Sequence, residues 1–243
     1  LKQIKMTTIN IFASVDVNGF INDYKSQIIS YYGGIDVTSK YMSVELEEVL
    51  IRIKDRQLAP IKFGYSDDPT HPNTLPAYTR LISSKNSTIG YKVYEEDYEW
   101  IDKEKGELQL NNIYNLMISA VNGDKIVWWG HSIKANSHIQ AIISNIDKPG
   151  SSTTPPSQFK NMKRKNIQFY YASSAVDPDN LFTGIEVSTQ QAYCIQCDLQ
   201  GNPGTTVSYD IALMLLSTSF NYAGSLISVP IVEIVVDPTV VIR

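Results

Sequence analysis

The residue types best suited to holding a ligand surround the pair Trp128-Trp129. Neighbouring side chains of a strand point to opposite faces, so one indole can enter the core while the other lies on the outer face or beneath a covering segment. An indole on the outer face can stack on a sugar ring while polar groups bind the hydroxyls. We therefore predict a glycan-binding site made of Trp128, Trp129, His131, Asn136 and His138. The alternative is that both tryptophans only pack.

The histidines offer a second chemistry. His131 and His138 are seven residues apart in sequence after the tryptophan strand, and a metal site can be drawn from them with Asp124. The plainer interpretation makes them polar residues at the end of a strand, and we predict no metal. A Ser-His-Asp triad can also be drawn with either of them or with His71, but the sequence supplies no geometry for one.

Signatures of catalysis are missing from the sequence, which has no Gly-x-Ser-x-Gly elbow, P-loop or Gly-x-Gly-x-x-Gly. The acidic groups at 67–68, 95–97 and 177–179 each lie within one short segment, whereas a glycosidase needs two carboxylates that face each other across the bond to be cleaved. The last group could bind Ca²⁺, although an Asx-Pro turn is commoner. We predict no catalytic residues, no cofactor and no enzyme activity, with a carbohydrate-active hydrolase as the alternative.

Charge and hydropathy exclude further classes of protein. The net charge of −4 argues against a general nucleic-acid binder, which needs clustered lysine and arginine. The basic cluster at 160–165 is predicted to be a solvated surface loop, although it could dock an anionic partner. No apolar run is long enough to span a membrane, and polar residues interrupt any N-terminal signal. We predict no membrane partner and a cytoplasmic protein, with a secreted lectin or toxin-like binding module as the alternative.

The two cysteines are predicted to be packing residues. Cys194 and Cys197 would point to opposite faces of a strand, which is poor geometry for a disulfide. A single Cys-x-x-Cys also lacks the second ligand pair of a structural zinc site. We therefore expect two buried free thiols.

The elements that must position these residues are mostly short strands. Alternating or apolar runs predict strands at 7–15, 108–121, 125–131, 167–172, 190–197, 207–216 and 226–236. Asn18-Gly19 predicts a turn, and Asn122-Gly123 between two apolar runs predicts a type I′ hairpin. Residues 44–58 have apolar side chains at helical spacing and predict a helix, although a strand also fits. This pattern predicts an all-β fold, an antiparallel β-sandwich of the jelly-roll or immunoglobulin-like kind.

Five segments of the sequence stand out: Ile9-Asn10-Ile11-Phe12 with Asp16, Gly34-Ile35-Asp36 with Lys40-Tyr41-Met42, Gly123 to Gly130, Ser132 to Ser137, and Ser228 to Ile234. Together they resemble the bacterial PixA/AidA inclusion-body protein family. In the last segment the family usually has Trp-Asp-Pro, and the Trp and Asp are absent here. The resemblance covers 7–42 and 107–236, which makes 45–106 an insertion of mixed structure within a single domain spanning 1–243.

The resemblance implies an all-β sandwich, accumulation in cytoplasmic inclusions and no established enzyme activity. Sugar binding is implied only for some relatives. Ordered inclusions require repeated contacts between copies, and the weak net charge opposes such contacts little. We therefore predict a homo-oligomer whose interface uses Tyr91, Tyr94, Tyr98 and Trp100, because aromatic residues are enriched at interface cores. The alternative is that these four side chains pack on the protein's own sandwich.

Overall fold

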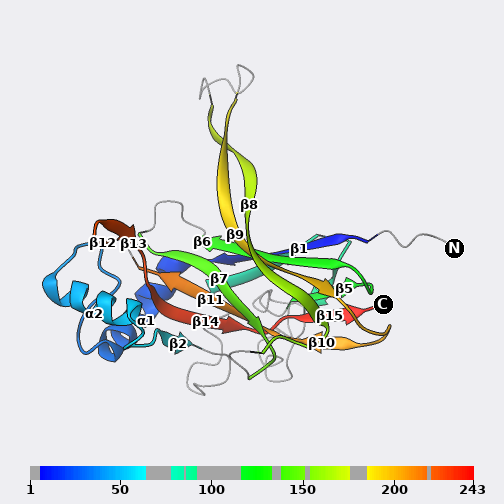
Figure 1. Cartoon of the computed structure of the whole chain (residues 1–243), viewed down its shortest axis with the longest axis horizontal. Helices are drawn as coiled ribbons and strands as arrows, with labels where there is room; N and C mark the ends of the chain where they lie inside the picture. The colour runs from blue at the N-terminus through cyan, green and yellow to red at the C-terminus, as the bar shows by residue number, and fades with distance from the viewer. Residues whose placement is uncertain are drawn as a thin grey trace, which may run out of the picture.

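The computed structural model describes residues 6–63, 78–84, 86–91, 116–132, 138–150, 154–175, 185–217 and 220–243 (Figure 1). Strands dominate these ranges, and the all-β prediction is confirmed in that coarse form. The helices are α1 (Val17–Tyr31) and α2 (Val44–Lys54). The strands are β1 (Thr8–Val15), β2 (Ile61–Phe63), β3 (Thr79–Ser83), β4 (Thr88–Tyr91), β5 (Leu116–Ala120), β6 (Lys125–Ser132), β7 (Gln140–Asp147), β8 (Phe159–Ala175), β9 (Ile185–Leu199), β10 (Thr206–Ser208), β11 (Asp210–Leu216), β12 (Phe220–Tyr222), β13 (Ser225–Ile227), β14 (Pro230–Val236) and β15 (Thr239–Ile242).

Three larger sheets carry most of the strands. Their strand orders are β3-β1-β6-β9-β8, β10-β15-β5-β4 and β2-β14-β11-β7, and β12 and β13 form a separate hairpin. The sheets are mixed rather than purely antiparallel, because β1 runs parallel to β6, β14 to β2, and β15 to β5. Parallel neighbours need a long connection, and the described elements that join β1 to β6 are both helices and the four strands β2 to β5. Periodicity cannot show such pairing, because it reports only which face of a strand is buried.

The core is centred on aromatic side chains from three segments. Trp128 of β6 is fully buried, and its indole Nε1 donates a hydrogen bond to the hydroxyl of Tyr209 at 3.1 Å. The ring of Phe159 lies 5.2 Å from that of Trp128 and 5.1 Å from that of Tyr209, measured between centroids. Burial strongly raises the pKa of the Tyr209 phenol, so this hydroxyl stays protonated. The three rings thus join β6, β8 and the start of β11.

Helix α1 begins where a turn was predicted, and that prediction is wrong. The carboxylate of Asp16 caps the helix by accepting from the backbone N–H of Gly19 at 3.0 Å. A Cβ at Gly19 would lie 2.7 Å from a carboxylate oxygen of Asp16, so glycine makes room for this cap. Phe20, Tyr24 and Ile28, each four residues apart, bury one face of the helix.

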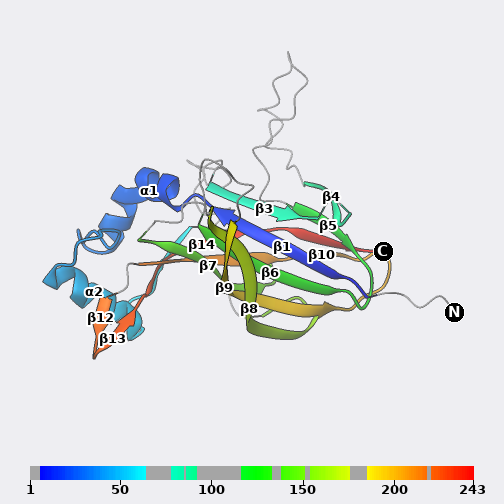
Figure 2. The same ribbon diagram turned by 90° about the horizontal axis from the view of Figure 1, so that it is seen from above.

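Helix α2 confirms the helix predicted within 44–58. Ser43 caps it by accepting from the backbone N–H of Leu46 at 3.2 Å, and the buried side chains repeat at helical spacing. The two helices and the β12–β13 hairpin lie together at one end of the sheets, away from the C-terminus (Figures 1 and 2). We call this the helical end. Neither described helix is long and apolar enough to cross a membrane.

Asn122-Gly123 forms a turn, but the predicted hairpin is wrong. Gly123 has a φ of 94°, and the turn links β5 to β6, which belong to different sheets. Asp124 follows the turn, and its carboxylate accepts the backbone N–H groups of Thr7 and Val121, each at 2.9 Å. This carboxylate therefore holds the turn against the start of β1, and both of its oxygens have partners.

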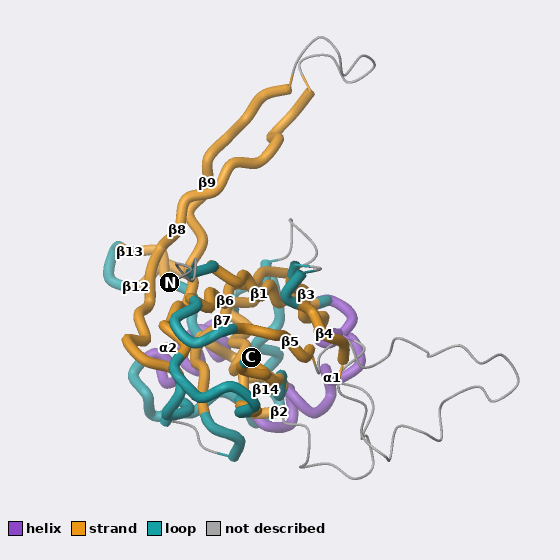
Figure 3. The backbone as a smooth tube through the Cα atoms, turned by 90° about the vertical axis from the view of Figure 1, so that its right-hand side faces the viewer, coloured by secondary structure: helices purple, strands orange, loops and turns teal. Residues whose placement is uncertain are grey.

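The basic cluster at 160–165 lies in β8 rather than in the surface loop that was predicted. Strands β8 and β9 continue beyond the sheets as a two-stranded hairpin that projects from the body (Figures 1 and 3). The range 45–106 contributes β2, β3 and β4, and each is the edge strand of a different large sheet.

Candidate functional site

The two tryptophans of β6 point to opposite faces of the sheet. Trp128 has no exposed surface, so it belongs to the core and does not line a surface site, which corrects its place in the predicted set. Trp129 is half-buried, and its ring meets that of Phe12 of β1 edge-on, with the centroids 4.8 Å apart. The outer face of this sheet therefore carries the aromatic pair Phe12–Trp129.

Strand register extends this pair into a row across four strands. Phe12 is paired with Ile82 of β3 on one side and with Trp129 on the other, and Trp129 is paired with Cys194 of β9. Residues paired in this way share one face of a sheet. Ile82 is 49% exposed, whereas Cys194 is buried. We call Ile82, Phe12, Trp129 and Cys194 the outer-face row.

The chemistry of the outer-face row is that of a flat apolar surface. It holds no carboxylate, imidazole or hydroxyl, and its one thiol, that of Cys194, is buried, so its exposed part can stack on a ring or another apolar face. Polar groups border it, since exposed Asn10 lies two residues before Phe12 and exposed Lys165 is paired with Cys194. The row is therefore suited to binding.

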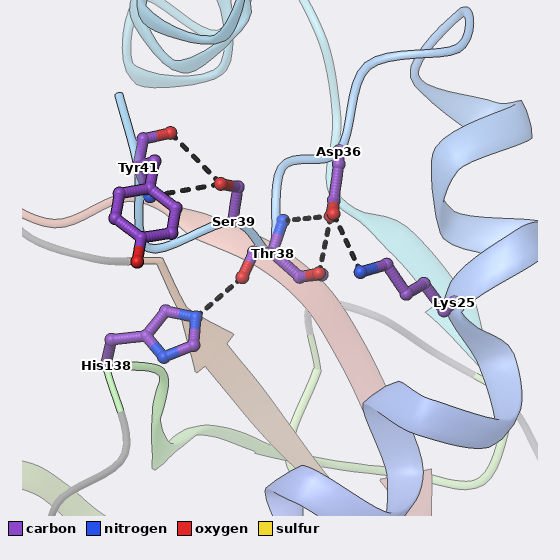
Figure 4. Close-up of polar contacts among 6 residues, drawn as sticks. All are labelled: Lys25, Asp36, Thr38, Ser39, Tyr41 and His138. Carbon is purple, nitrogen blue, oxygen red and sulfur yellow. Dashed lines mark hydrogen bonds and ion pairs between the residues drawn. The ribbon is translucent and has the colours of Figure 1, made fainter. Parts of the chain in front are cut away.

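A second group of polar contacts lies at the helical end (Figure 4). His138, just before β7, places Nε2 2.6 Å from the backbone oxygen of Thr38 in the loop between the helices. Asp36 in that loop pairs with Lys25 of α1 at 2.9 Å and accepts from the backbone N–H and the hydroxyl of Thr38 at 3.0 and 2.5 Å. We call Lys25, Asp36, Thr38 and His138 the loop cluster.

The loop cluster holds the Asp36 carboxyl in its ionised form. Partial burial opposes ionisation, but the hydrogen bonds from Thr38 and the ammonium of Lys25 outweigh it and lower the pKa of Asp36 below its ordinary value. The carboxylate is thereby a fixed anchor for the loop. Ser39 extends this anchoring, because its hydroxyl donates to the backbone oxygen of Tyr41 and accepts the N–H of Tyr41, each at 3.0 Å.

Beyond this anchored loop the chain exposes apolar side chains. Tyr41 is 73% exposed and Val44 is 70% exposed, with Met42 between them at 43%. Tyr31 at the end of α1 is also exposed. We call Tyr31, Tyr41, Met42 and Val44 the apolar patch.

The other predicted site residues are only partly placed. The backbone of His131 lies in β6 opposite Ser14, and that of Tyr91 lies in β4, but neither side chain is among those described. Asn136, Tyr94, Tyr98 and Trp100 lie outside the described residues. His138 contacts the backbone oxygen of Thr38 at the helical end. Phe12 and Ile82 were missed, although alternation along β1 already places Phe12 on the face opposite Ile11 and Ala13.

In the described ranges, no group of three or more His, Cys, Asp or Glu residues could hold a metal ion. Cys194 and Cys197 are free and buried. Burial raises the pKa of the Cys197 thiol to about 12, so it is not a thiolate at neutral pH.

Comparison with known proteins identifies the family. The PixA family, described as inclusion body protein, matches residues 48–234. That range includes most of 45–106 and begins after the N-terminal segments on which the resemblance partly rested. No curated protein sequence matches the chain significantly. A crystal structure of the inclusion body protein PixA from Burkholderia cenocepacia J2315 shares the fold with a TM-score of 0.52 and 12% identity, covering 100% of this chain and 99% of the other. The chain belongs to the PixA family of inclusion body proteins.

Proposed function

We propose that this chain is a non-catalytic protein that assembles with copies of itself in cytoplasmic inclusions. Family membership supports the inclusion-body part of the proposal. The observation that carries self-assembly is the apolar patch, because four of the seven large apolar side chains exposed in the described residues lie between 31 and 44. Exposed large apolar side chains gathered in one part of the chain favour an interaction surface.

The patch has the properties of a contact between folded copies. The loop cluster and the Ser39 contacts fix the backbone that carries it, so little ordering is needed when a partner binds. Full burial of an exposed valine or methionine side chain contributes about 1.5–3 kcal/mol, and a partner can still bury the exposed 70% of Val44 and 43% of Met42. The net charge of −4 opposes association only weakly.

Light scattering and sedimentation of the purified chain test this proposal. We expect an oligomer at tens of micromolar, and a shift toward smaller species when Tyr41→Ser and Met42→Ser are combined. Met6→Ser with Ile89→Ser is the matched control, because both side chains are exposed and lie outside the patch. An unaltered chain that remains a monomer at this concentration would falsify the proposal.

Glycan binding at the outer-face row is a second candidate function. The half-buried indole of Trp129 beside Phe12 favours it, since sugars stack on such surfaces. A glycan array followed by titration tests it, and Trp129→Ala should weaken binding about tenfold or more. Trp129→Phe controls for lost packing, and Tyr41→Ala controls for loss of an exposed aromatic elsewhere. A turnover assay on any glycan that binds separates a lectin from the alternative hydrolase.

We also infer that residues 1–243 form one sandwich-like domain with 45–106 inserted in it. One buried cluster draws side chains from all three large sheets, and the described strands of the range 45–106 are all edge strands of those sheets. An edge strand can be added without breaking existing pairs. Limited proteolysis should therefore not release a folded 107–243 fragment, and recovery of such a fragment would contradict the single domain.

A further inference from the structure

The hairpin of β8 and β9 leaves the body of the protein as a free arm (Figures 1 and 3). Strand β9 pairs with β6 only from Cys194 to Asp198. Its pairing with β8 continues much further, from Ile167 opposite Ala192 to Ala175 opposite Ile185. We call residues 166–175 and 185–193 the arm. Among the described strands, the arm has no neighbour on either side.

Such an arm presents two open rows of backbone donors and acceptors. An isolated two-stranded hairpin is only marginally stable in water, and an open strand edge is a template for pairing with another strand. The register of β8 runs without interruption from Lys163 to Ala172, opposite Gln196 to Val187. The regular part of this edge is thus long enough to accept a full additional strand.

Charge protects one half of this edge and not the other. Where β8 borders the body it carries Lys160, Lys163, Arg164 and Lys165, all exposed, and lysine on an edge strand discourages further pairing. The arm that follows has Glu186 as its one charged residue and is rich in residues that favour strands, such as Ile167, Phe169 and Tyr170. The edge of β8 therefore resists pairing with another strand beside the sheets, where it is charged, and can accept one along the arm.

We propose that the arms of two copies of this chain pair edge to edge and form a continuous sheet between them. This inference rests on the proposed self-assembly and adds a second contact between copies to the one proposed at the apolar patch. Identical edges can always pair antiparallel about a twofold axis, and the nearly uncharged arm lets two copies approach without repulsion. Because each arm has two edges, pairing at both extends the assembly beyond a dimer, which suits an inclusion.

Charge complementation tests the arm directly. Gln168→Lys with Gln190→Lys places two positive charges on each arm, at positions that are not paired with each other. Gln168→Glu with Gln190→Glu places two negative charges at the same positions. Each variant alone should associate about tenfold more weakly or worse than the unaltered chain, because like charges oppose each other across paired strands. An equimolar mixture of the two variants should regain association.

The control is Gln140→Lys with Ser208→Lys, which adds the same charge at exposed positions outside the arm and should leave association unchanged. Circular dichroism and the thermal midpoint verify that each variant folds. If the unaltered chain assembles and the lysine variant assembles equally well, the arm inference is wrong and the proposed function stands. If both variants dissociate but their mixture does not recover, the arm binds another surface or another protein's strand, and arm-to-arm pairing is wrong. A monomeric unaltered chain overturns both proposals.

Discussion

The imidazole Nε2 of His138 lies 2.6 Å from the backbone oxygen of Thr38, and this hydrogen bond joins two segments that are 100 residues apart in the chain. A carbonyl oxygen can only accept, so Nε2 carries the proton. Thr38 lies within the Gly34–Met42 segment that resembles the PixA family, and His138 directly follows the Ser132–Ser137 segment. The contact therefore ties two family-like segments together beside the apolar patch.

Removal of the hydrogen bond between His138 and Thr38 should destabilise the folded chain. We expect His138→Ala to lower the free energy of unfolding by about 0.5–1.5 kcal/mol, the net value of one hydrogen bond, as measured by urea denaturation. His138→Gln retains an N–H donor and should recover part of the loss. Equal stability of the alanine variant and the unaltered chain would show that the contact contributes nothing.

The ionised Asp36 carboxylate should stabilise the folded chain at neutral pH and lose this contribution in acid. Its pKa is lowered in the folded chain, so its stabilising contribution is present above the unfolded value of about 3.9 and is lost as the pH falls through the folded value. Asp36→Asn should therefore be less stable than the unaltered chain at pH 7, and the difference should shrink in acid. Denaturation curves from pH 7 to pH 2 measure this, with exposed Glu48→Gln as the control.

The ionised Asp210 carboxylate should instead lower the free energy of unfolding at neutral pH. It is paired across the strands with buried Asp147, and burial together with neighbouring carboxylates raises the pKa of Asp210 above its ordinary value. Its ionised form is destabilising above the folded pKa, and this penalty disappears as the pH falls toward the unfolded value. Asp210→Asn should thus raise the free energy of unfolding at neutral pH, and the gain should vanish in acid. A loss of stability at pH 7 would contradict this sign.

The hydroxyl of Tyr209 should contribute to the stability of the folded chain. Tyr209→Phe keeps the ring but leaves the buried indole N–H of Trp128 without the acceptor it has in the folded chain. We expect a loss of about 1–3 kcal/mol in the free energy of unfolding. Tyr41→Phe removes a hydroxyl from an exposed ring and should change stability by less than about 0.5 kcal/mol.

Local elements were predictable where neighbouring residues decide the backbone conformation. The alternation of β1 and the apolar spacing of α2 each report one buried face, and both predictions are confirmed. Helix α1 was missed because Asn18-Gly19 favours a turn, whereas the Asp16 cap needs glycine at this place in the first turn. The turn at Asn122-Gly123 was predicted correctly, but its strands separate into two sheets, because β5 pairs with β4 and β15 while β6 pairs with β1 and β9.

By itself, the sequence determined the β-rich composition, the family resemblance and the fact that Trp128 and Trp129 would occupy opposite faces. Tertiary structure decided which tryptophan is buried, because the aromatic partners Tyr209 and Phe159 come from distant segments. It also decided that Phe12 and Ile82 join Trp129 in one row, since strand register is fixed by packing between residues far apart in the chain. The arm has the same origin, because β9 loses β6 as a neighbour beyond Cys194 while β8 continues beside it. Side-chain periodicity records which face of a strand is buried, and the pairing of strands depends on contacts that no local pattern contains.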